Sequence, residues 1–135
     1  MHDTSSGPAR KENSVNVVKL NTERVTKDPS PNPLFFGPVV IERLRTRENG
    51  QNFKIGLVCF EKGNRTKFHS HDTDQVLWVK TGRGIVMTDN EKIMLEPGEL
   101  VFIPAGLNHW HGAPDDTYYE HISFLPLECV ETVNE

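Results

Sequence analysis

Short apolar runs recur along the chain from residue 35 onwards, and most of them end at glycine, proline, asparagine or aspartate. Within several runs apolar and polar residues alternate, which is typical of a β-strand with one face turned towards a core. The pattern predicts strands at residues 35–44, 53–60, 66–71, 75–80, 85–88, 92–95, 100–103 and 118–125. No convincing amphipathic helix interrupts them. Many short strands with regular turns indicate an all-β sandwich or barrel.

The two ends of the sequence carry weaker patterns. Residues 1–14 are small, polar and charged, so we expect a flexible tail ahead of a single domain at residues 15–135. Residues 15–20 are β-branched and predict a strand at a sheet edge or on a partner subunit, and hence a homodimer. Three prolines make residues 28–33 a connector. Residues 127–135 predict a short turn or a frayed strand.

Composition narrows the classes of partner. The chain has 135 residues, 36% hydrophobic and 25% charged, with a formal net charge of −4. The Lys and Arg residues form no dense run, which argues against a nucleic-acid backbone as partner. Cys59 and Cys129 match no disulfide framework or CxxC motif, and a reducing compartment suits them. No apolar run approaches the ~20 residues that span a bilayer, so we expect no membrane association and a cytoplasmic protein.

Two histidine pairs carry the candidate chemistry. His69 and His71 are two residues apart, as are His109 and His111, and an extended chain sends alternate side chains to one face. Each pair can therefore reach a common point. Imidazoles delivered from two separate strands are the ligands that a first-row transition metal needs. The spacing predicts a metal site.

The two segments that carry these pairs match a known signature. Residues 63–82 read Gly-x5-His-x-His-x3-Gln-x6-Gly, and residues 98–113 contain Gly-x5-Pro-x-Gly-x2-His. This pairing of motifs resembles the cupins, which are double-stranded β-helix or jelly-roll barrels that hold a metal between the two motifs. The sequence around His109 and His121 is similar to a narrower group. That group comprises small cupins related to carboxymuconolactone decarboxylase-associated proteins, and it includes the bacterial cupin hydroxynitrile lyases.

The resemblance implies one divalent metal per chain. Its expected ligands are His69, His71, Gln75 and His109. The commonest cupin pattern has glutamate where this chain has Gln75, whose other interpretation is an ordinary polar residue that begins a strand. A neutral amide would leave the full +2 charge on the metal, which favours Lewis-acid chemistry. Mn, Fe, Co, Ni or Zn would suit such a site, and affinity alone does not select among them.

The resemblance also places His111 and His121 near the metal. Each is either a catalytic group that moves a proton or a structural histidine that hydrogen-bonds within the core. A lyase that cleaves a carbon–carbon bond next to an oxygen in a small-molecule substrate is the function that the resemblance implies. A dioxygenase is the enzymatic alternative. A non-catalytic cupin that binds a metal or a small ligand is the other, because fold does not determine reaction.

Overall fold

The computed structural model describes residue 17 and residues 33–37, 39–45 and 52–135. These residues form ten β-strands and no helix. The strands are β1 (Val40–Arg45), β2 (Phe53–Phe60), β3 (His69–His71), β4 (Gln75–Gly82), β5 (Gly84–Thr88), β6 (Lys92–Leu95), β7 (Leu100–Ile103), β8 (His109–Gly112), β9 (Tyr119–Pro126) and β10 (Glu131–Val133). The described part of the chain therefore contains no helix that could cross a membrane.

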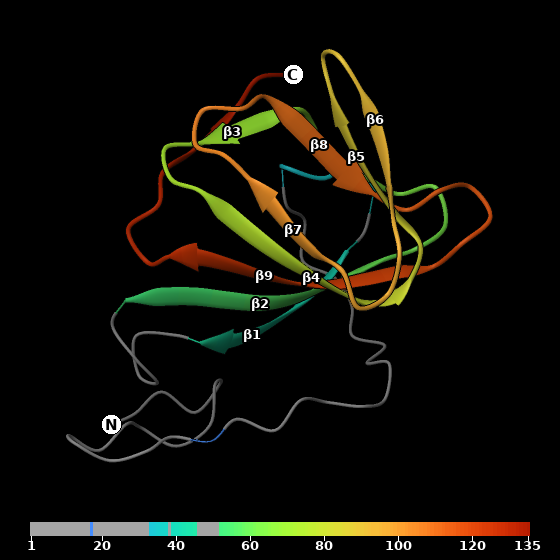
Figure 1. Cartoon of the computed structure of the whole chain (residues 1–135), viewed down its shortest axis with the longest axis horizontal. Helices are drawn as coiled ribbons and strands as arrows, with labels where there is room; N and C mark the ends of the chain where they lie inside the picture. Colours follow the sequence, from blue (N-terminus) through green and yellow to red (C-terminus); the bar gives the residue numbers. More distant parts are fainter. Residues whose placement is uncertain (1–16, 18–32, 38, 46–51) are drawn as a thin grey trace.

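The strands form two five-stranded sheets. One sheet has the order β1-β2-β9-β4-β7 and the other has the order β10-β3-β8-β5-β6, and every pairing is antiparallel. In Figure 1 the first sheet lies in the lower half of the barrel and the second in the upper half. The all-β class predicted from the turn pattern is confirmed.

Strand alternation fills the space between the sheets. Phe60, Leu77, Val79 and Tyr119 are fully buried and belong to one large apolar cluster. The residues that alternate with them along the strands point to the other face of the first sheet. There Leu57 and Ile122 form a second, smaller cluster, against which the partly buried Trp78 packs. The residues that share a face with the large cluster are therefore the ones that can line an internal site.

Two predicted strands begin several residues before the observed ones. A strand at residues 35–44 is predicted, but β1 begins at Val40, because Phe35 instead bridges to Thr66. A strand at residues 66–71 is predicted, but β3 begins at His69. The backbone of residues 65–67 bonds to two different segments, through Gly112 on one side and Leu34 on the other. The segments predicted at residues 1–14 and 15–20, apart from residue 17, and most of the connector lie outside the described residues.

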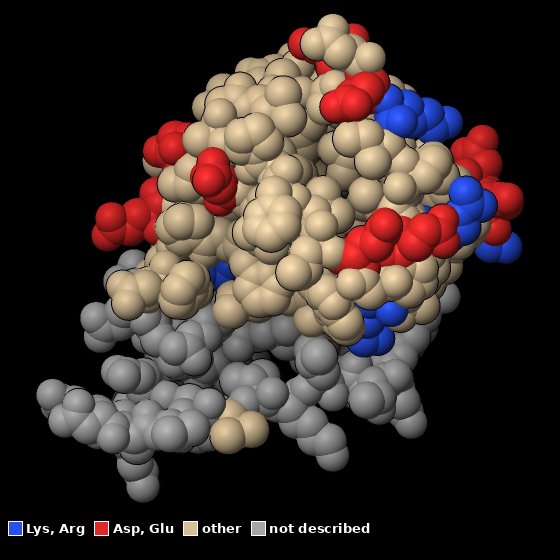
Figure 2. All heavy atoms as spheres, viewed as in Figure 1, with Lys and Arg blue, Asp and Glu red and all other residues tan. Residues whose placement is uncertain are grey.

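Charged side chains of both signs lie mainly towards the rim of the face seen in Figure 2. The middle of this face, over β7 and β8 in the same view, carries no charged side chain. This face therefore presents no continuous surface of one sign.

Candidate metal centre

Three buried histidines meet between the sheets. His69 on β3 lies directly opposite His109 on β8, and their ring centroids are 4.4 Å apart. His71 follows two residues after His69 on the same strand face, with its ring 5.0 Å from that of His69. One nitrogen from each of the three rings lies within 4.8 Å of the others. That separation allows all three to bind one ion, at about 2.0–2.1 Å per nitrogen for zinc.

Backbone carbonyls orient two of these rings. Nδ1 of His69 lies 2.7 Å from the carbonyl oxygen of Lys67, and Nδ1 of His109 lies 2.9 Å from that of Leu107. A carbonyl oxygen only accepts, so both Nδ1 atoms carry a proton and both Nε2 atoms keep a lone pair. Nε2 of His109 is buried without a hydrogen-bond partner. This arrangement is the one by which proteins prepare imidazole for a metal.

Gln75 approaches from the other sheet, at the start of β4. Its Nε2 donates to Oγ of Ser123 over 2.9 Å, which turns Oε1 the other way. That oxygen is buried without a partner. A buried acceptor with nothing to accept from is costly, and a cation beside it would offset that cost. The orphaned amide oxygen and the prepared imidazoles fit a divalent transition metal.

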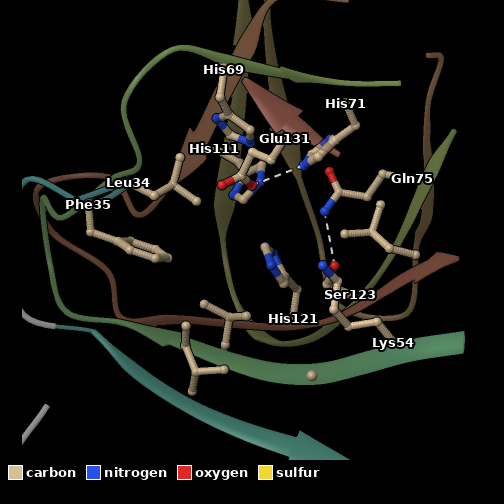
Figure 3. Close-up of a pocket in the computed structure, with 14 residues that line it drawn as sticks. Leu34, Phe35, Lys54, His69, His71, Gln75, His111, His121, Ser123 and Glu131 are labelled. Atoms are coloured by element: carbon tan, nitrogen blue, oxygen red, sulfur yellow. Dashed lines mark hydrogen bonds and ion pairs between the residues drawn. The ribbon is translucent and has the colours of Figure 1, made fainter. Parts of the chain in front are cut away.

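A cavity of about 170 Å³ opens beside these groups. Figure 3 shows His69, His71, Gln75, His111 and His121 directed towards one space, from both sheets. Its polar wall also includes Ser123, Glu131 and Lys54, and its apolar wall is formed by Leu34, Phe35, Ile41, Gly56, Val58 and Leu125. The polar groups are thus gathered on one side of a partly apolar space.

His111 and His121 continue the histidine cluster away from the three-histidine group. The ring of His111 is 5.3 Å from that of His69 and 5.0 Å from that of His121. Neither nitrogen of His111 has a hydrogen-bond partner. His121 shares one hydrogen bond, between its Nδ1 and the hydroxyl of Tyr119 at 2.8 Å, and its Nε2 is unpartnered. The structure thus brings together all six residues that the sequence predicted for the site.

Burial governs the protonation of this cluster. It lowers the pKa of His109 to about 4 and that of His121 to about 3, and it lowers the pKa of His69 and His111. The neighbouring imidazoles add to the effect on His111, because each would repel a second positive charge. All four rings are therefore neutral near pH 7, which is the form that binds a metal or accepts a proton.

One carboxylate at the site was missed by the sequence analysis. Glu131 on β10 pairs with His71 on β3, and its Oε1 lies 3.2 Å from Nε2 of His71. This hydrogen bond lowers the pKa of the Glu131 carboxyl group. The sequence gives only a weak indication of Glu131, because it is one of several acidic residues near the end of the chain. Register across β3 and β10 is what places it in the cavity.

Comparison with known proteins identifies the family. A family model described as a cupin domain matches residues 56–123, which is more than half of the chain. The chain belongs to the cupin family. The two facing sheets are accordingly those of a jelly-roll barrel, as the two motifs implied.

Individual relatives agree with this assignment. The cupin is 32% identical over 108 residues to an (R)-mandelonitrile lyase from Granulicella tundricola, covering 79% of this chain and 81% of the relative. It superposes on a cupin-like protein from Thermotoga maritima with a TM-score of 0.71 at 30% identity, covering 83% and 90% of the two chains. A polyketide cyclase from Streptomyces resistomycificus shares the fold at a TM-score of 0.68 and 18% identity, covering 93% and 86%.

Proposed function

We propose that this cupin is a metal-dependent lyase that cleaves the carbon–carbon bond next to the oxygen of a small hydroxynitrile. The observation that carries the proposal is the pair of buried, neutral histidines, His111 and His121, beside a three-histidine group. A site that only stored a metal would not need two further imidazoles with unpartnered nitrogens facing a cavity. The likeness to a mandelonitrile lyase supports the same class of reaction.

His69, His71, His109 and Gln75 would hold one divalent transition metal per chain. When bound, such a metal supplies Lewis acidity towards the oxygen of a substrate, without a change of oxidation state. The carbonyls of Lys67 and Leu107 fix the ring orientations that present Nε2 of His69 and His109. The bond from Gln75 to Ser123 does the same for the amide oxygen.

The proton transfer falls to His121. Its Nδ1 shares a hydrogen bond with Tyr119, which leaves Nε2 to take the hydroxyl proton of the substrate. The carbon–oxygen double bond forms as the bond to the nitrile carbon breaks, and the electron pair leaves with cyanide. The protonated His121 then returns its proton to cyanide, so that the products are a carbonyl compound and hydrogen cyanide. His111 orients the nitrile by donating an N–H hydrogen bond.

The size of the cavity limits the substrate. Its volume of about 170 Å³ is close to the ~150 Å³ of an apolar cavity that accommodates benzene. The substrate should therefore carry at most one ring or a short aliphatic chain. Phe35, Val58 and Leu125 offer that group an apolar surface opposite the histidines.

Metal content tests the first half of the proposal. We expect close to one divalent metal per chain in the purified protein by elemental analysis, and its loss in the double variant His69→Ala, His109→Ala. These two residues face one another across β3 and β8, so the double variant removes two of the three imidazoles. Unchanged metal content in the double variant would refute the site.

A substrate screen tests the second half. Aromatic and aliphatic hydroxynitriles, 1,2-diketones and lactones are incubated with the metal-loaded protein, with and without oxygen. Cyanide release without oxygen uptake is the expected result. Oxygen uptake would indicate a dioxygenase instead of a lyase. Absence of reaction with every compound would favour a non-catalytic binding protein.

A further inference from the structure

Position 75 is a glutamine where the commonest cupin pattern has a glutamate. In this structure a carboxylate reaches the cavity from strand β10 instead. Glu131 lines the same cavity as His71 and Gln75, and its Oε1 lies 3.2 Å from Nε2 of His71. Figure 3 shows this contact and the amide of Gln75 on the other side of His71. We propose that Glu131 is an additional, anionic ligand of the metal. This inference rests on the metal site proposed above.

The distance between the two atoms suits shared ligation. Two donors at about 2.1 Å from one cation and at right angles to each other are about 3.0 Å apart. The 3.2 Å between Oε1 of Glu131 and Nε2 of His71 is near this value. The donor atoms that lie within 4.8 Å of one another belong to the three histidines and not to Glu131, so the carboxylate would turn towards the ion as it binds. In the absence of metal, one proton lies between the two atoms and satisfies both. A cation that binds Nε2 displaces that proton, and the carboxylate oxygen then faces the cation.

Strand β10 holds Glu131 in place from both sides. Before it, the backbone of Val130 exchanges two hydrogen bonds with Asp72, the residue next to His71. After it, Asn134 donates from its backbone to the carbonyl of Phe68, and Glu135 accepts from the backbone of Phe68 over 2.8 Å. The strand is thus anchored at both ends to residues that adjoin His69 and His71. Its register is set by the backbone, so the Glu131 side chain is not needed to position it.

A carboxylate at this place changes the charge of the site. With three imidazoles and an amide as ligands, the metal would keep its full +2 charge; Glu131 cancels one unit of it. With Glu131 as a fifth ligand beside three imidazoles and Gln75, a six-coordinate ion would keep one free position. A single free position suits a substrate that binds through one hydroxyl oxygen.

Cobalt(II) makes the proposal testable, because its visible absorption bands respond to the identity and number of its ligands. Wild type, Glu131→Gln and Glu131→Ala are stripped of metal and titrated with cobalt(II), with a chelator as competitor. The control is Glu128→Gln, an exposed glutamate that does not line the cavity. We expect both Glu131 variants to bind cobalt at least about tenfold more weakly and with altered bands, and Glu128→Gln to match wild type.

The outcomes separate this inference from the one it rests on. If wild type binds cobalt and the bands are the same in both Glu131 variants, Glu131 is not a ligand and only this inference fails. If wild type binds no cobalt, the metal site itself is refuted and the role of Glu131 falls with it. Far-ultraviolet circular dichroism of the metal-free variants, expected to match wild type, shows that they keep the β fold.

Discussion

The side chain of His121 is fully buried and uses only one of its two ring nitrogens for a hydrogen bond. A histidine with a purely structural role would be expected to hydrogen-bond through both ring nitrogens, since an unpaired buried nitrogen is costly. The ring lies 5.0 Å from that of His111 and lines the cavity. At the scale of one residue, this unused nitrogen is the observation that supports the proposed role of His121 as a base.

We predict that His121→Ala retains the metal but loses lyase turnover by about 10²-fold or more, the usual contribution of a general base. The residue lies outside the group of three histidines that could hold the ion, so metal content should not change. Tyr119→Phe is the matched control, because it removes the hydroxyl that bonds to Nδ1 and leaves the imidazole in place. It should lose far less activity. Full activity in His121→Ala would remove this residue from the mechanism.

Residue positions within the motifs were predictable because strand geometry is local. Alternation alone put His69 with His71, and His109 with His111, on common faces. It also put Tyr119, His121 and Ser123 on one face of β9, where the structure shows them bonded to each other or to Gln75. The tautomers were not predictable, because they depend on carbonyls whose direction the fold determines.

At the scale of elements, the site depends on how closely β8 packs against the segment before β3. Thr66 and His111 share two hydrogen bonds, one between backbones at 2.9 Å and one through the threonine hydroxyl at 3.2 Å. Beside them, Gly112 is so close to Arg65 that an added Cβ would lie 2.5 Å from Cβ of Arg65 and from the carbonyl oxygen of Asn64. Glycine permits the approach that holds His111 over the cavity.

We therefore predict that Gly112→Ala lowers the free energy of unfolding by roughly 2 kcal/mol, because backbone and Cβ atoms cannot move aside without shifting the strands. Urea denaturation measures this. Gly106→Ala is the control, since its φ of 82° strains alanine but nothing lies within 4 Å of the new methyl group. It should cost only about 1 kcal/mol. Equal losses in the two variants would mean that the close approach does not matter.

The bounds of a strand were predictable where turn residues mark its ends. They were less predictable where the strand end depends on pairing with a distant segment. The strand at residues 53–60 was predicted with its observed bounds. The bounds of β1 and β3 differed because Phe35 and Thr66 pair with each other instead of extending those strands. The last segment, predicted as a turn or a frayed strand, is ordered in the structure by its bonds to residues around β3.

At the scale of the whole molecule, the buried imidazoles couple stability to pH. The pKa of His121 is about 3 in the folded protein and near 6.5 in the unfolded chain. Between these values the unfolded chain binds a proton that the folded chain does not. The stabilisation is therefore complete above about pH 6.5 and is lost as pH falls, at up to roughly 1.4 kcal/mol per pH unit for each such histidine.

We expect the free energy of unfolding of the metal-free protein to fall steeply between pH 6 and pH 4, with a smaller slope in His121→Leu. Urea denaturation at several pH values, with metal removed by chelation, measures both slopes. Identical slopes would show that His121 is not buried in its neutral form. His109, whose pKa is about 4, contributes to the same fall above pH 4.

Association of two chains remains a prediction. It was made from residues 15–20, of which the structure describes only residue 17. An independent reason is β7, which lies at one end of its sheet and exposes 57% of Leu100 and 72% of Phe102. An edge strand with such side chains favours pairing with another chain.

We expect a dimeric mass by light scattering after size exclusion, and a monomeric mass for Phe102→Asp. The control is Ile93→Asp on β6, which introduces the same charge at the edge of the other sheet. A monomeric wild type would contradict the prediction. If both variants are monomeric, the interface is not specific to β7.

The sequence by itself determined the all-β class, the order of most strands and the pairs of histidines on common faces, because these follow from turn residues and from the two-residue period of a strand. Only the tertiary structure decided which strands lie side by side. That pairing set His69 against His109, turned Gln75 towards Ser123 and brought Glu131 to His71. Each of these contacts joins residues more than 35 positions apart, and local periodicity carries no information about such distances.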